Sequence, residues 1–196
     1  MKNTFLTLIS LFLAALAGNA QDNFTWGNAN VYFVITDRFA NGDSTNDINY
    51  GRINDYGSER LNAATFHGGD FKGMTQKAKE GYFTNLGIDV VWMTDVYEQI
   101  HGWMSGSGAI NDFPHYGYHG YYPLDYTQID KNYGTVAEFR ELVDVLHAQG
   151  IRVMLGANIN NPGYPTLLDA VQYGDIILSA FPRHHSDLPN APLHRA

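Results

Sequence analysis

Short apolar runs alternate with amphipathic stretches along the chain. Residues 31–36, 89–94 and 151–155 are brief runs rich in β-branched side chains, which is typical of strands buried on both faces. Between them, residues 74–86 and 135–149 place apolar side chains three and four positions apart, as an amphipathic helix does. The pattern predicts alternating strands and helices, and therefore an α/β protein with a parallel sheet.

The ends of the two helices can be predicted from local chemistry. Thr135-Val-Ala-Glu138 is a capping box, in which the first and fourth side chains bond each other's backbone N–H groups. Gly87 and Gly150 follow the two amphipathic stretches, where a glycine commonly ends a helix. Each helix is therefore expected to lead into the next strand through a turn of only two or three residues.

The segments that follow the strands are long. Residues 37–70 and 95–134 are rich in Gly, Asn, Asp, Tyr and His, and loops of more than about 12–15 residues in a compact domain are usually functional. In a (β/α)₈ TIM barrel, the site lies on the loops after the strands. A doubly wound sheet stays open as an alternative, although no G-x-G-x-x-G motif follows the first strand.

The pattern weakens after Asn160, where several prolines interrupt it. Residues 167–173 are expected to form a short helix, and residues 182–196 show no periodicity. We therefore expect a folded region over residues 21–181 and an unstructured tail over 182–196.

The first twenty residues are typical of a secretory signal peptide. A basic start at Lys2 precedes an apolar run from Thr4 to Ala17, and small residues end at Ala20. The alternative is an N-terminal membrane anchor, but an apolar run of about 14 residues is shorter than the ~20 that span a bilayer. Removal of 20 of the 196 residues leaves 176. The mature chain is expected to be exported, periplasmic or secreted by a bacterium, with no further membrane contact.

Charge and cysteine content exclude several functions. The formal net charge is −8, which argues against a nucleic-acid partner because such proteins carry basic patches. The chain has no cysteine, so it has no disulfide, thiolate metal site or cysteine nucleophile. Its 13 Tyr and 11 Phe would suit sugar binding, although an aromatic core would give the same composition.

A cluster of oxygen-bearing side chains follows the first strand. Ca²⁺ takes six to eight oxygen ligands from carboxylates, amides and backbone carbonyls. Closely spaced Asn and Asp with intervening Gly would let a loop fold around such an ion, and a solvated turn is the alternative. The candidate ligands are Asn41, Asp43, Asn46, Asp47, Gly68 and Asp70.

Three other groups of reactive side chains have weaker patterns. His115 and His119 have the spacing of zinc ligands on a helix, but the prolines and glycines around them predict a loop. The His184-His185-x-Asp187 motif lies in the expected unstructured tail. The serines of residues 105–107 do not form a G-x-S-x-G nucleophile motif.

The loop that contains His115 and His119 is also rich in tyrosine. Tyr rings there could stack on sugar faces while imidazole nitrogens bond hydroxyl groups. The alternative is an aromatic cluster that packs under a long loop. The tyrosines concerned are Tyr116, Tyr118, Tyr121 and Tyr122.

Several strings resemble the α-amylase family of glycoside hydrolases, in the family's order, from about Asn30 to Tyr173. They include VYFVITDRFANGD (31–43), HGGDFKGM (67–74), GIDVVWMT (87–94), YHGYYPLDY (118–126) and YGT (133–135). The strings YEQIHGW (97–103), DFPH (112–115) and GYPTL (163–167) are most similar to the periplasmic bacterial branch of that family.

The resemblance implies a (β/α)₈ barrel, of which this chain would supply the first three βα units. It places the candidate ligands named above at a calcium site, with calcium as cofactor, and Asn160 at a second calcium. It also places His119 and Tyr121 where the family bonds and stacks the sugar, so the expected ligand is an α-glucan or a maltooligosaccharide. The oligomeric state is left open.

The first family signature, Asp-x-x-x-Asn-His, reads Gly156-Ala-Asn-Ile-Asn-Asn161 here. Asn160 fits the signature, whereas Gly156 replaces the Asp, and Asn161 replaces the substrate-bonding His. The lost Asp supports neighbouring catalytic groups electrostatically, so its absence is expected to weaken them.

The family is a retaining glycosidase, and its nucleophile and acid/base follow later strands. None of those motifs occurs in the 196 residues, and a TIM barrel takes roughly 250 residues. We therefore expect an N-terminal part of an α-amylase-type hydrolase of α-1,4-glucosidic bonds that is inactive alone. The alternatives are a non-catalytic glucan-binding remnant and a non-functional fragment.

Overall fold

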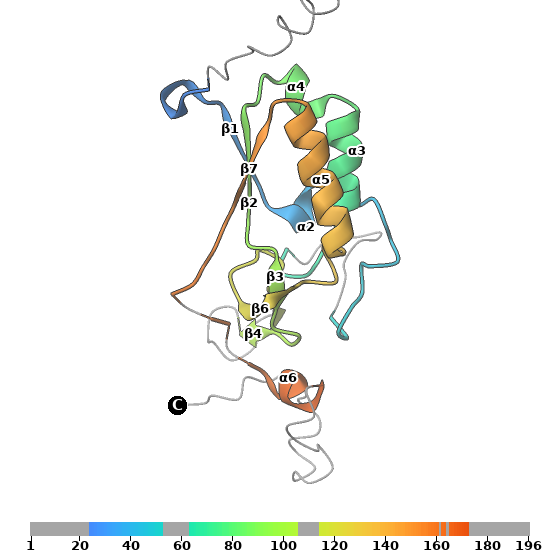
Figure 1. Ribbon diagram of the computed structural model, residues 1–196. Helices are drawn as coiled ribbons and strands as arrows, with labels where there is room; N and C mark the ends of the chain where they lie inside the picture. The colour runs from blue at the N-terminus through green and yellow to red at the C-terminus, as the bar shows by residue number, and fades with distance from the viewer. Residues whose placement is uncertain (1–23, 53–62, 106–113, 161, 164, 173–196) are drawn as a thin grey trace, which may run out of the picture.

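The computed structural model describes residues 24–52, 63–105, 114–160, 162–163 and 165–172 (Figure 1). The expected signal peptide, Asn161 and the expected tail lie outside the described residues.

The centre of the fold is a parallel sheet made from the predicted strands. Strands β1 (Val31–Val34), β2 (Val90–Met93) and β7 (Arg152–Leu155) pair in the order β1-β2-β7. Their register aligns Val34 with Met93 and Met93 with Leu155. Because the strands run in parallel, the residues that follow them gather at one edge of the sheet.

The first strand is shorter than predicted. The helix α2 (Thr36–Phe39) begins two residues after Val34. The prediction that the strand continued to Thr36 was wrong, since apolarity alone does not show where pairing with the neighbouring strand ends. The early turn places the buried Asp37 close to the edge of the sheet.

Three helices lie on one side of the sheet (Figure 1), namely α3 (Phe71–Lys79), α4 (Tyr82–Asn85) and α5 (Val136–Ala148). A single helix over residues 74–86 was predicted, and this prediction was wrong at the start and in the middle, whereas the end before Gly87 agrees with the structure. The chain becomes helical at Phe71 because the Asp70 carboxylate accepts the Gly73 N–H at 2.6 Å, as an N-cap does. It breaks at Gly81, whose φ of 81° lies in the left-handed region that glycine adopts without strain.

The predicted capping box of α5 is confirmed. The Thr135 side chain accepts the Glu138 N–H, and the Glu138 carboxylate accepts the Thr135 N–H at 2.7 Å. From this start, α5 buries Leu142 and Leu146 against α3 and the sheet. Buried aromatic and aliphatic side chains, among them Phe71, form the core between the helices and β2.

The segment predicted as a loop over residues 95–134 contains two antiparallel ribbons. Strand β3 (Tyr97–Gln99) pairs with β6 (Pro123–Ile129), and β4 (Met104–Ser105) pairs with β5 (Pro114–His115). The loop prediction was therefore wrong here, because short strands with an irregular register leave little periodicity in the sequence.

Two short helices complete the described elements. A 3₁₀ turn, η1 (Trp26–Asn28), precedes β1, and α6 (Leu167–Gln172) matches the predicted short helix near residue 170. None of the helices within the described residues is long and apolar enough to cross a membrane.

The sheet face away from the helices carries large exposed side chains. Phe33 on β1 and Trp92 on β2 stand side by side with ring centroids 4.9 Å apart and are 46% and 40% exposed. No helix covers this face within the part of the chain that the structure describes (Figure 1).

Candidate functional site

A buried carboxylate lies where β1 ends. Asp37 is 1% exposed, and its carboxylate accepts the backbone N–H groups of His67 at 2.9 Å and Gly68 at 3.2 Å. The Arg38 guanidinium lies 3.1 Å from the same carboxylate. Burial raises the pKa of Asp37 to about 7, although Arg38 and the two N–H groups act in the opposite direction. A cavity of about 180 Å³ opens beside these groups, with Asn41 also in its wall.

Most of the predicted calcium ligands come together in the loop after α2, around Asp70. The fully buried Asp70 carboxylate accepts the N–H groups of Gly42 at 3.0 Å and Asp43 at 2.9 Å, and the Asn46 amide at 3.2 Å. These bonds add to the one from Gly73 that begins α3. A single carboxylate therefore fixes both the loop and the helix.

The other predicted ligands are arranged in two ways. Asn41 donates to the Asp47 carboxylate at 2.7 Å, and Gly68 packs against both side chains. The Asp43 carboxylate instead accepts a hydrogen bond from Lys72 at 2.5 Å, which holds the pKa of Asp43 well below its usual range. Asn160 is exposed after β7, and no contact described for this part of the chain joins it to the loop.

The fit of this loop to a calcium ion can be judged from the oxygen atoms it offers. The Asn46 side-chain oxygen is buried and has no hydrogen-bond partner, which is the state expected of an oxygen that has a cation for a partner. The carboxylates of Asp47 and Asp70 are buried nearby. Across residues 24–52, 63–105 and 114–172 as far as they are described, no three acidic or histidine side chains are grouped closely enough to hold a metal. Calcium binding at Asn46 would therefore rely on amide and backbone oxygens as well as carboxylates.

The predicted sugar-binding residues lie in a stack of aromatic rings. The His119 ring lies 5.2 Å from the rings of both His115 and Tyr121, at angles of 24° and 32°. Tyr121 is 42% exposed and its N–H donates to His119 Nδ1 at 2.9 Å. His119 is therefore held with Nδ1 as acceptor, so its neutral ring carries the proton on Nε2.

Electrostatics keep the His119 ring neutral. Burial, together with the nearby His115 and Arg38, lowers the pKa of His119 to about 4. The Arg38 guanidinium lies 3.7 Å from the centre of the Tyr118 ring, whose own centroid is 5.1 Å from that of His119. Arg38 thus joins the Asp37 carboxylate to the aromatic stack, which offers a flat face and a neutral N–H donor.

The structure does not place His115 and His119 on a helix, which was the geometry behind the zinc interpretation. His115 lies in β5, and the residues up to His119 form a turn rather than a helix. His119 Nδ1 accepts a backbone N–H, and His115 Nδ1 lies 3.2 Å from the Tyr122 hydroxyl.

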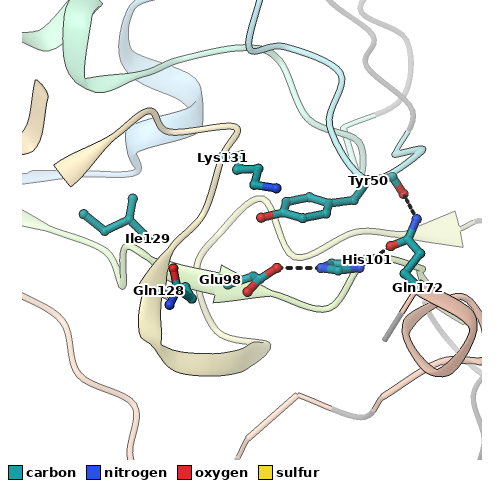
Figure 2. Close-up of a pocket in the computed structure, with 7 residues that line it drawn as sticks. All are labelled: Tyr50, Glu98, His101, Gln128, Ile129, Lys131 and Gln172. Carbon is teal, nitrogen blue, oxygen red and sulfur yellow. Dashed lines mark hydrogen bonds and ion pairs between the residues drawn. The ribbon is translucent and has the colours of Figure 1, made fainter. Parts of the chain in front are cut away.

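A separate cavity of about 390 Å³ lies between β3, β6 and α6 (Figure 2). His101 is one of the residues that line it: its Nε2 lies 2.8 Å from the Glu98 carboxylate, and the Tyr50 ring stacks on the imidazole with the ring centroids 3.9 Å apart. The Gln172 amide donates to the Tyr50 carbonyl at 3.1 Å, and Lys131 lies over the Tyr50 ring. Burial raises the pKa of Tyr50 well above its ordinary value. These contacts join α6 to the loop around Tyr50.

Sequence patterns did not point to several residues that the structure places in or near the site. These are Asp37, Arg38, the Glu98–His101 pair and the buried Asp95 after β2. A usable signal existed for the two aspartates, because each follows a predicted buried strand within three residues. In parallel α/β sheets, ligands bind at this end of the strands.

Comparison with known proteins places this geometry in a family. Residues 33–166 match the alpha amylase catalytic domain. The chain is 49% identical over 150 residues to the periplasmic alpha-amylase of Escherichia coli, covering 76% of this chain and 21% of the relative. It is 32% identical over 142 residues to a cyclomaltodextrin glucanotransferase of Paenibacillus macerans, covering 68% of this chain and 19% of the relative.

Solved structures agree with the sequence relatives. An Anoxybacillus alpha-amylase superposes with a TM-score of 0.57 at 27% identity, covering 78% of this chain and 29% of that one. The alpha-amylase of Geobacillus thermoleovorans, solved with acarbose, gives a TM-score of 0.52 at 27% identity, with 78% and 28% covered. The chain spans about a fifth of the length of the sequence relatives named here. Its matched residues and its parallel sheet together show that the chain belongs to the alpha-amylase catalytic domain family.

Proposed function

We propose that this chain carries part of the glucan-binding wall of an α-amylase-type glycoside hydrolase that acts on α-1,4-glucosidic bonds by a retaining mechanism. The observation that supports it is the ring stack of His119 and the exposed Tyr121 beside Arg38 and Asp37. A sugar ring would stack on Tyr121, while His119 Nε2–H would donate to a hydroxyl. The parallel sheet would be the first sector of the family's barrel, contributing three of its βα units.

The chemistry of bond cleavage is proposed to lie outside this chain. A retaining glycosidase needs two carboxyl groups about 5–5.5 Å apart, one as nucleophile and one as acid/base. The family motifs that supply them do not occur in the 196 residues. The chain by itself would therefore bind a maltooligosaccharide without hydrolysing it.

Calorimetric titration with maltoheptaose tests the proposed binding. The full chain should bind weakly, and Tyr121→Ala should weaken binding severalfold. Trp26→Ala is the matched control, because Trp26 is an exposed aromatic at 62% in the distant η1 turn. Absence of heat at millimolar ligand, or equal losses in both variants, would reject the binding role. Release of reducing sugar from starch by the chain would instead reject the proposal that cleavage needs residues outside it.

Calcium is proposed as a structural cofactor of the loop around Asn46 and Asp70. The unpartnered, buried Asn46 oxygen supports this assignment. The ion would hold the loop by gathering oxygens from Asn41, Asn46, Asp47, Gly68 and Asp70. Asp43 would join them only after leaving Lys72.

Export is proposed from two observations. Residues 1–20 have the pattern of a cleavable signal peptide, and the 49% identical relative is periplasmic. N-terminal sequencing of the chain recovered from a periplasmic extract should begin at Gln21, and an intact Met1 would contradict the proposal.

A further inference from the structure

At the edge of the sheet, the space between the ends of β2 and β7 holds only one side chain. β2 and β7 pair in parallel, with Met93 opposite Leu155, so the residues after them lie close together. A Cβ atom at position 156 would lie 2.3 Å from Asp95 Oδ1 and 3.1 Å from Asp95 N. Non-bonded carbon and oxygen atoms do not approach so closely, so a side chain at position 156 and the present Asp95 side chain exclude each other.

Asp95 has little freedom to move aside. It is 1% exposed, and its Oδ2 accepts the Asn158 N–H at 2.5 Å. On the other side, Gly120 packs so closely that a Cβ there would lie 2.5 Å from the Asp95 carbonyl oxygen. Gly120 directly follows His119, so Asp95 is packed between the sugar-binding loop and the segment after β7.

The same carboxylate organises the segment after β7. Asn158 is held at both of its backbone polar groups, since its N–H donates to Asp95 and its carbonyl accepts the Tyr126 hydroxyl at 2.7 Å. This segment carries Asn160, two residues further on. Loss of the Asp95 carboxylate would release one of the two anchors and leave the part-buried Asn158 N–H without this acceptor.

We propose that the Asp95 carboxylate, at the end of β2, occupies the space that a side chain at position 156 would otherwise fill. Asp95 is a positioning residue that sets the path of residues 156–160 beside His119. Gly156 is then a requirement of Asp95 rather than a simple loss. That this edge binds glucan rests on the proposed function, whereas the exclusion between the two positions does not.

A double-mutant cycle tests the exclusion. Gly156→Asp alone should lower the melting temperature of the full chain, because it adds a clash and a second carboxylate to one space. The double variant D95A/G156D should melt well above G156D, even though D95A alone also melts below the unmodified chain. Gly27→Asp is the control, because nothing lies within 4 Å of a Cβ at Gly27. G27D should combine additively with D95A.

Two outcomes of this cycle are decisive. Recovery of the melting temperature in D95A/G156D beyond the sum of the single changes supports the shared position. A double variant no more stable than that sum overturns it. If G156D does not fold, Gly156→Ala tests the same contact, and D95A should relieve its loss in the same way.

Charge and positioning have separate readouts. Gly156→Asn introduces the shape of aspartate without its charge. The melting temperature of G156D should therefore lie further below that of G156N at pH 7 than at pH 4, where one carboxyl can stay protonated. Identical melting of the two variants at both pH values would overturn the role assigned to the carboxylate. Asp95→Asn, whose amide oxygen can still accept the Asn158 N–H, should lose less stability than D95A, and equal losses would overturn the positioning role.

Maltoheptaose titration completes the test. D95A should weaken binding severalfold, and D95A/G156D should recover most of it. If D95A/G156D regains stability but not maltoheptaose binding, the inference that either position can supply the carboxylate beside His119 is overturned. If the unmodified chain binds no maltoheptaose, the proposed function fails, while the melting cycle still decides the exclusion between Asp95 and Gly156.

Discussion

Arg52 Nη1 donates to Asp130 Oδ1 at 2.7 Å, and both side chains are completely buried. The same guanidinium donates to the carbonyl oxygens of Gln99 and Ile100 and to the Asn132 side chain. Arg52 therefore ties the polar loop after α2 to the end of β3 and to the residues after β6. Its donors are matched by acceptors from two separate segments, residues 99–100 and 130–132, so Arg52 joins three segments of the described chain where the parallel sheet does not reach.

Removing either partner of this buried pair should be strongly destabilising. Arg52→Met leaves the Asp130 carboxylate buried without its cation, and such losses cost about 3–5 kcal/mol of unfolding free energy. Urea unfolding measures the change. The control is Lys79→Met, because Lys79 and Glu141 form a 2.7 Å pair in which both side chains are more than half exposed. Exposed pairs contribute about 0–1 kcal/mol, so equal losses in the two variants would contradict the assignment.

Calcium should stabilise the folded chain. An ion that binds only the folded state adds about 2.7 kcal/mol when its concentration is a hundred times Kd. The melting temperature should therefore rise when chelator is replaced by millimolar calcium, and Asn46→Ala should abolish most of the rise. Asn85→Ala, at the exposed end of α4, should respond like the unmodified chain. A melting temperature that is the same in calcium and in chelator would remove calcium from this loop.

Asp37 should make stability fall as the pH rises. Folding raises its pKa from 3.8 to about 7, so between these values the folded state keeps a proton that the unfolded state has released. The stabilising contribution is complete below about pH 4 and is lost as the pH rises through about 7. A pH series of melting temperatures should show that this decline is absent in Asp37→Asn. It should persist in Asp144→Asn, which changes an exposed carboxylate on α5, and parallel curves for all three proteins would reject the buried proton.

The His119 ring should make the stability of the folded chain fall as the pH falls, which is opposite to the effect of Asp37. Folding lowers its pKa from 6.5 to about 4, so its contribution is complete above pH 6.5 and is lost as the pH falls toward 4. The NMR signal of the His119 ring should accordingly titrate near pH 4. His147, exposed in the last turn of α5, provides an internal comparison in the same spectra. A His119 midpoint at or above 6.5 would show that the ring is not held neutral by its surroundings.

The start of α5 should depend on one hydroxyl. Thr135→Ala removes the acceptor for the Glu138 N–H, and loss of an N-cap costs about 0.5–2 kcal/mol. Thr135→Ser keeps the hydroxyl and should retain most of the stability in urea unfolding. Equal stability of the Ala variant and the unmodified chain would mean that packing alone fixes the helix start.

Sequence patterns predicted the elements whose cause is local. The capping box at Thr135 was placed correctly, and the apolar strand predicted over residues 89–94 was located to within one residue at each end, because each depends on a few adjacent residues. The ribbon of β3 and β6 was missed because its pairs, such as Glu98 with Asp125, join distant residues with irregular register. The break at Gly81 was missed because the apolar periodicity continues across it.

The candidate site likewise contains features with a local cause, which the sequence predicts, and features that depend on distant residues, which it does not. The proximity of His119 and Tyr121 follows from their spacing within one short turn. The role of Asp95 could not be predicted in this way, because it depends on which strand lies beside β2 and on the glycine at its end. Burial of Asp37 likewise depends on the segment around His67, thirty residues away in the chain.

Asp70 gives the polar loop a built-in reporter. Its carboxylate holds the Gly73 amide of the first turn of α3 and, at the same time, the amides of Gly42 and Asp43. Any event that draws this carboxylate toward the loop must loosen its hold on the helix, so hydrogen–deuterium exchange at the Gly73 amide would register occupancy of the loop from a position outside it.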